Sequence, residues 1–133
     1  MKKLSVAFLL FLGLTSSLLA QQSVIVPATM ASITIVGNTA TALLVTGQAG
    51  KSIYVTAVDL IPVAGSTVQF IQGTGPTCGT GTSNLTGSLV FSAGQTYLKG
   101  DGYGTFWVLA QGNSLCVVIG AALAPGSLAY AQF

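Results

Sequence analysis

One stretch decides the fold of this chain, and it reads Gly73-Thr74-Gly75-Pro76-Thr77-Cys78-Gly79-Thr80-Gly81-Thr82-Ser83-Asn84-Leu85-Thr86-Gly87. Glycine, proline, serine and asparagine favour turns, because glycine accepts positive φ angles and the others fix or cap tight bends. The stretch also contains Cys78, one of only two cysteines. The second, Cys116, lies in the run 115–119, whose β-branched residues are typical of a strand. We therefore expect a loop over 73–87 that a Cys78–Cys116 disulfide pins to a β-sheet.

Short runs of β-branched and aromatic residues lie on both sides of this loop. They cover residues 23–26, 32–36, 39–46, 52–61, 67–72, 87–91, 95–98, 105–110, 115–119 and 127–133. No segment shows a helical period with caps. Short strands separated by glycine turns predict an all-β protein, here a single antiparallel β-sandwich of jelly-roll type with about eight short strands. The run 51–63 is apolar on both alternating faces, which indicates a central strand covered on both faces for part of its length.

The first twenty residues have the pattern of a secretory signal peptide. Lys2 and Lys3 precede an apolar run over 4–14, and Ala20 offers a small residue for cleavage. The apolar run is short for a bilayer span, which needs about 20 residues. We expect a signal peptide over 1–20 and one β-sandwich domain over 21–133, with no membrane span in the mature form. A membrane anchor or a buried helix is the alternative.

The charge of the chain excludes one class of partner. Its formal net charge of +2 comes from Lys2 and Lys3, so the segment 21–133 sums to zero. Binding to nucleic acid depends on several basic contacts with phosphates, which two lysines do not supply. A net charge near zero also removes the repulsion between copies. We expect no nucleic acid, and instead a homo-oligomer or a subunit of a larger assembly.

The inventory of reactive side chains predicts no enzyme and no catalytic, cofactor or metal site. The chain contains no His, Glu or Arg, and Lys51, Asp59, Lys99 and Asp101 are its only ionic side chains outside the leader. A nucleophilic Ser or Cys needs a neighbouring base. The glycine-rich loop lacks the Gly-Lys-Ser/Thr of a phosphate-binding loop.

The two cysteines fit a disulfide better than a metal. Exported chains with an even number of cysteines usually form disulfides, and two cysteines without His or Glu do not complete a zinc shell. We expect Cys78 and Cys116 to be joined, with their Cα atoms within about 7 Å. Closing this loop stabilises the fold by about 3–4 kcal/mol in the chain-entropy model. Two free buried thiols are the alternative.

Aromatic residues gather late in the chain, at Tyr97, Tyr103, Phe106, Trp107 and Tyr130. Exposed aromatic side chains form sugar- or protein-binding surfaces, so Tyr97, Tyr103 and Trp107 are a candidate surface for a cell-surface glycan or protein. Core packing is the alternative. Phe106 and Trp107 point to opposite faces of one strand, and we expect one of the two to be buried.

Four motifs carry a resemblance to a known group of proteins. They are Thr77-Cys78-Gly79-Thr80-Gly81-Thr82, Leu85-Thr86-Gly87, Asn113-Ser114-Leu115-Cys116 and Gly126-Ser127-Leu128-Ala129-Tyr130-Ala131-Gln132-Phe133. In their order, the segment from about Lys51 to Phe133 resembles small β-sandwich modules of tailed-phage and metagenomic virion structural proteins, often found at their C-termini. The resemblance implies a β-sandwich used in capsid decoration, fibres or attachment, without enzymatic activity.

The leader separates this interpretation from two others. Virion proteins normally assemble in the cytoplasm, where a disulfide stays reduced. An exported bacterial surface or periplasmic protein with a binding or structural role is therefore the alternative, and a small outer-membrane β-barrel is the third. The expected location is secreted, periplasmic or cell-surface, or the virion if a phage encodes the chain.

Cleavage of the leader is directly testable. We expect export to remove residues 1–20 and leave Gln21 as the new N-terminus. Intact mass of the exported protein measures this. A mass that still includes Met1 to Ala20 would contradict the prediction and support the membrane anchor.

Overall fold

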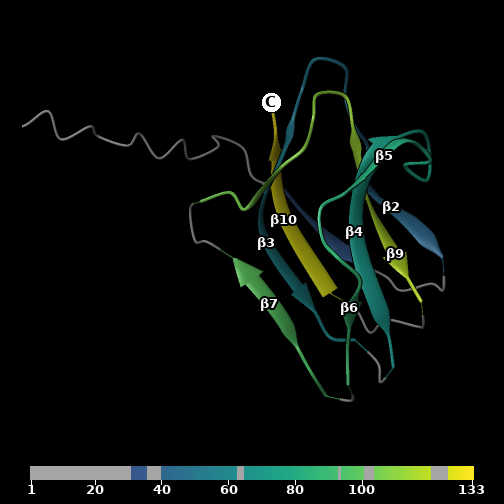
Figure 1. Cartoon of the computed structure of the whole chain (residues 1–133). Coiled ribbons are helices and arrows are strands. Elements are labelled where there is room, and N and C mark those ends of the chain that lie inside the picture. The colour runs from purple at the N-terminus through teal and green to yellow at the C-terminus, as the bar shows by residue number, and fades with distance from the viewer. Residues whose placement is uncertain (1–30, 36–39, 63–64, 93, 101–103, 121–125) are drawn as a thin grey trace, which may run out of the picture.

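The computed structural model describes residues 31–35, 40–62, 65–92, 94–100, 104–120 and 126–133. The expected signal peptide and the run 23–26 lie outside these residues. The described part forms two antiparallel sheets packed against each other (Figure 1), which confirms the predicted all-β sandwich. None of its segments is a helix long and apolar enough to cross a membrane.

Ten strands make up the described sandwich, where the sequence predicts about eight. They are β1 (Ala31–Ile35), β2 (Thr41–Val45), β3 (Ile53–Leu60), β4 (Thr67–Thr74), β5 (Thr80–Asn84), β6 (Leu89–Val90), β7 (Tyr97–Gly100), β8 (Trp107–Val108), β9 (Ser114–Ile119) and β10 (Gly126–Gln132).

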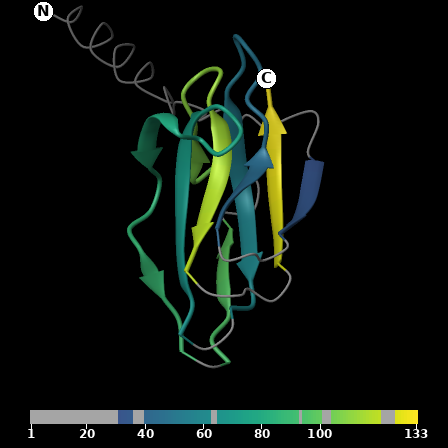
Figure 2. The same cartoon turned by 90° about the vertical axis from the view of Figure 1, so that its right-hand side faces the viewer.

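The two sheets follow the same plan, seen from two directions in Figures 1 and 2. In the first sheet β10 lies between β1 and β3, and in the second β9 lies between β2 and β4. The other edge of β3, and likewise the other edge of β4, pairs with two short strands. Along β3, β8 pairs with one half and β7 with the other. Along β4, β6 and β5 divide the edge in the same way.

A β-bulge in β3 sets which of its residues face the core. Val55 pairs with Tyr130 and Ala57 pairs with Ala129, so Thr56 is the extra residue. The Thr56 hydroxyl donates a hydrogen bond to the carbonyl oxygen of Ala129 at 3.2 Å. The extra residue shifts the two-residue alternation by one position. This is why the sequence reads as apolar on both faces.

The core lies between the two sheets and consists of aliphatic and aromatic side chains. Phe70 of β4 is its largest fully buried side chain. Around it pack Ile35, Val45, Ile53, Val55, Val58, Leu60, Val68, Phe91, Trp107, Leu109, Leu115, Val117, Ile119 and Leu128.

The stretch over 73–87 is less of a loop than its composition predicts. β4 continues to Thr74 and β5 begins at Thr80, so a strand lies inside the expected loop. The threonines of 80–84 explain this difference, because β-branched side chains favour extended backbone. At the start of the turn, a Cβ on Gly73 would lie 2.5 Å from the carbonyl oxygen of Cys78. Only glycine lets the turn fold back so closely.

The disulfide fastens this turn to the outside of the second sheet. Cys78 and Cys116 are bonded with a Cα–Cα distance of 6.2 Å, which confirms the predicted pair and its spacing. Both are buried, with Ile71 and Val118, in a small cluster separate from the main core. The bond therefore holds the turn on its own sheet and does not join the two sheets.

Removing the disulfide tests its contribution to stability. The two cysteines are 38 residues apart, for which the chain-entropy model gives about 4 kcal/mol. We expect the double variant Cys78→Ser/Cys116→Ser to lose roughly this much free energy of unfolding in urea, and the reduced parent protein to match it. An oxidised parent that unfolds at the same urea concentration as the double variant would contradict this role.

Candidate binding face

The predicted binding residues do not form one exposed surface in the described part of the chain. Trp107 is 8% exposed and packs against Phe70, with ring centroids 4.9 Å apart. Tyr97 is half-buried and lies edge-on to Phe91. Tyr103 lies outside the described residues. The expectation that one of Phe106 and Trp107 is buried is confirmed by Trp107, whose place is in the core.

Tyr130 packs against the core from β10, and Phe106 lies beside Trp107 next to the edge strand β8. The rings of Phe106 and Trp107 meet edge to face at 4.7 Å. The Nζ atom of Lys99 lies 4.8 Å from the centroid of Phe106 and 5.7 Å from that of Trp107. Lys99 pairs with Val58, a core residue, so its side chain starts from the core side of β7. Its cation–π contacts cover the rings where the two sheets separate.

The candidate binding face is the outer face of the first sheet. Strand register places its residues in three neighbouring rows across the sheet. The middle row is Ser32, Ala129, Ala57 and Gly100; the second is Thr34, Ser127, Asp59 and Leu98; the third is Ala131, Tyr54 and Val108. We call these three rows, together with Phe133, face A.

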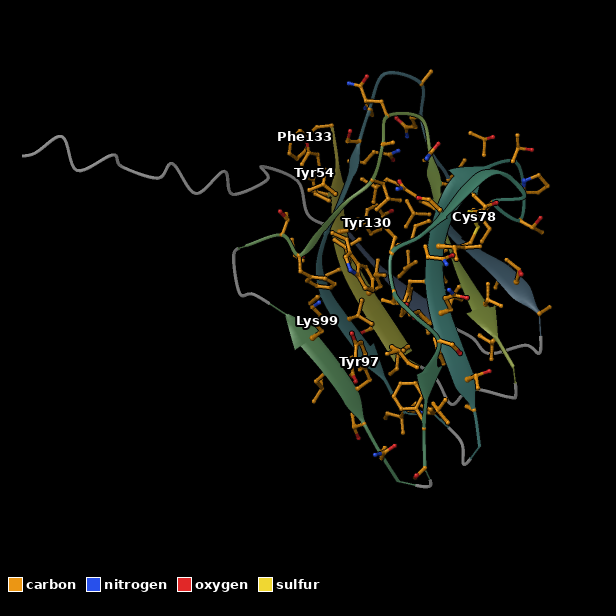
Figure 3. The ribbon with its side chains drawn as sticks, viewed as in Figure 1. Tyr54, Cys78, Tyr97, Lys99, Tyr130 and Phe133 are labelled. Atoms are coloured by element: carbon orange, nitrogen blue, oxygen red, sulfur yellow. A yellow bond between two sulfur atoms is a disulfide. The ribbon has the colours of Figure 1, made fainter. Side chains whose placement is uncertain are left out.

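One end of face A carries an aromatic pair, in which Phe133 is exposed and Tyr54 is half-buried. The rings of Tyr54 and Phe133 are stacked with centroids 4.3 Å apart and planes 6° apart, and Figure 3 shows them together near the C-terminus. Two backbone hydrogen bonds between Phe133 and Ser52, of 3.0 and 3.2 Å, hold the last residue beside β3. Phe133 is 49% exposed and Val108, next to Tyr54 in its row, is 53% exposed.

The middle of face A is hollowed. The small side chains of Ala57, Ala129 and Gly100 leave a depression of about 350 Å³, which Ser32, Asp59, Leu98 and Ser127 also line. The depression follows from the register, because the middle row contains no side chain larger than serine.

Asp59 stands at this hollow without a partner. Its Oδ1 atom is buried, and no hydrogen bond reaches that atom from the described residues. A buried carboxylate oxygen is costly unless a donor satisfies it. The hydroxyl groups of Ser32 and Ser127, on the same hollow, are exposed and also have no partner in the described part of the chain.

The sequence patterns do not single out the residues of face A. Tyr54, Ala57 and Asp59 share a face only because the bulge at Thr56 shifts the alternation. The signal that was available is the polar Asp59 within an otherwise apolar run. A charged residue at the centre of such a strand indicates a solvent-facing or ligand-facing position.

The described residues contain no group of three or more His, Cys, Asp or Glu side chains able to hold a metal ion. No protein-family model, curated protein or solved structure compared with this chain matches it.

The half-buried Tyr97 provides a test in alkaline solution. Burial raises the pKa of its hydroxyl above the ordinary value of about 10. The folded state favours the neutral phenol over the phenolate. The stability that the neutral Tyr97 side chain contributes is therefore fully present below about pH 10, and it is lost as the pH rises through the pKa of the folded state. We expect Tyr97→Phe to reduce the loss of stability between about pH 9 and about pH 11, measured by urea unfolding. Parent and variant curves that fall equally would contradict it.

Proposed function

We propose that this protein is a non-enzymatic structural or binding module, first of all a virion-associated β-sandwich of the decoration, fibre or attachment type. Its working surface is face A, through which it joins a larger assembly, copies of itself or a cell surface. The observation that carries the proposal is the exposed apolar character of face A.

The composition of face A supports contact with a partner. Leu98 is 73% exposed and stands with Val108, Phe133 and the small residues of the middle row on one side of one sheet. Monomeric soluble proteins rarely expose large contiguous apolar patches, and such patches mark interaction sites. Burial of apolar area stabilises a contact by about 25 cal/mol per Å² before the costs of association.

The distribution of charge supports the same proposal. Asp59 has the one carboxylate side chain of face A. Lys99, on the neighbouring edge, is directed to the aromatic rings of Phe106 and Trp107. A partner that approaches face A therefore meets few ionic side chains and little long-range repulsion.

An exported bacterial surface or periplasmic protein is the second candidate, and the disulfide favours it. The Cys78–Cys116 bond is compatible with an extracellular or periplasmic location. Both candidates use face A in the same way, so they differ in where the protein works and not in how it makes contact.

A pair of matched substitutions tests the use of face A in assembly. Leu98 and Val90 are both 73% exposed. Val90, however, lies on the outer face of the second sheet, because its neighbour Leu89 points to the opposite face and packs against the core. We expect the protein to form oligomers in a light-scattering dilution series. Leu98→Lys should move the midpoint of dissociation to at least about tenfold higher protein concentration, because the interface would have to desolvate a charge. Val90→Lys should leave it unchanged.

A parent protein that stays monomeric at high micromolar concentration, unchanged by salt, would contradict self-assembly. Equal effects of the two substitutions would contradict the use of face A.

A further inference from the structure

The side chains that line the hollow of face A limit the classes of ligand that it can bind. Its floor is apolar and shallow, from Ala57, Ala129 and Gly100. Its rim carries the hydroxyl groups of Ser32 and Ser127 and the buried Oδ1 atom of Asp59, for which the described residues provide no hydrogen-bond partner. Hydroxyl groups donate and accept hydrogen bonds, whereas an ionised carboxylate only accepts them. The ligand must therefore present several donors beside an apolar surface.

Three classes of ligand fail this requirement. An anion such as a phosphate would meet the Asp59 carboxylate. Lys99 also lines the hollow, but its Nζ atom is directed to the rings of Phe106 and Trp107. A metal ion would find a single carboxylate, because the described residues offer no cluster of three ligating side chains. A wholly apolar protein surface would leave the buried oxygen of Asp59 without a donor. The free-energy cost of that unsatisfied oxygen exceeds the stabilisation gained by burying the small side chains of the hollow.

A pyranose sugar meets the requirement. Its hydroxyl groups donate to a carboxylate and exchange hydrogen bonds with serine hydroxyls, and its C–H face packs on apolar and aromatic groups. It is also uncharged, which suits a face with a single carboxylate. The depression of about 350 Å³ lies within the range of small-ligand sites.

The stacked rings extend this site along β3. Tyr54 lies on the same strand and the same face as Asp59. Their partners Ala131 and Ser127 are four residues apart on β10, so the two side chains are roughly 13 Å apart at about 3.3 Å per residue. The exposed Phe133 ring and Val108 lie at that end. A chain of sugar units seated in the hollow reaches this apolar platform.

We propose that face A binds an uncharged oligosaccharide, with one sugar unit in the hollow at Asp59, Ser32 and Ser127 and the following units against Tyr54 and Phe133. This inference rests on the proposed function and names the ligand class of the same face.

The test is a titration of the disulfide-bonded protein, residues 21–133, followed by calorimetry and NMR. The probes are the neutral hexasaccharides maltohexaose, cellohexaose, laminarihexaose, mannohexaose and N-acetylchitohexaose, each with its monosaccharide. We expect saturable binding of at least one hexasaccharide and weaker binding of the matching monosaccharide, since only the longer chain contacts Tyr54.

Three substitutions locate the binding site. Asp59→Asn keeps the size of the side chain and removes the charged acceptor, so we expect binding about tenfold weaker or more. Ala129→Leu fills the hollow from the outside of the sheet and should abolish binding. Val90→Ala, on the other sheet, is the control and should bind as the parent does. Thermal unfolding of each variant verifies that it is folded.

Each result bears on the proposal separately from the proposed function. Absence of binding to all five hexasaccharides would overturn the inference, as would binding that Asp59→Asn and Ala129→Leu leave unchanged. If the protein then still assembles and Leu98→Lys still disrupts that assembly, face A contacts protein, and the proposed function stands without the sugar. A basic peptide that binds in place of the sugars, lost in Asp59→Asn, would likewise overturn the saccharide assignment.

Discussion

The structure depends on one extra residue in its central strand. Thr56 bulges out of the ladder between β3 and β10, and its hydroxyl is bonded to the carbonyl oxygen of Ala129. Before the bulge, Val55 faces the core; after it, Val58 does so, although an even strand would send these two residues to opposite faces. The bulge therefore keeps both halves of β3 apolar on the inside and gathers Tyr54, Ala57 and Asp59 on the outside.

Hydrophobic packing carries the stability of this sandwich, because the chain has few charges with which to form ion pairs. Phe70 and Trp107 meet at the centre of the core from opposite sheets. At the open edge, Lys99 covers the rings of Phe106 and Trp107. Lys99, one of the few cations, thus shields aromatic surface from water. Both its aliphatic stem and its ammonium group can contact the rings.

The two outer faces of the sandwich differ in the way they are covered. On the second sheet, the turn that contains Cys78 folds over Ile71 and Val118 and is fixed there by the disulfide. On the first sheet, the described residues place no such turn over the middle row, and small side chains leave it hollow. This asymmetry supports the proposal that face A is the surface for contact. The Oδ1 atom of Asp59, which has no hydrogen-bond partner among the described residues, would need a donor from the partner.

The sequence by itself determined the all-β class, the sandwich, most strand positions and the Cys78–Cys116 pair, since turn residues and β-branched runs act locally and two cysteines allow only one pairing. It predicted that either Phe106 or Trp107 is buried, but not which of the two. Side chains alternate between the two faces of a strand, and this alternation does not say which face is inside. The strand β5 was hidden by its glycine, serine and asparagine, which are typical of turns. Only the tertiary structure decided face A, because a bulge changes the alternation and the rows of a sheet join residues from strands far apart in the chain.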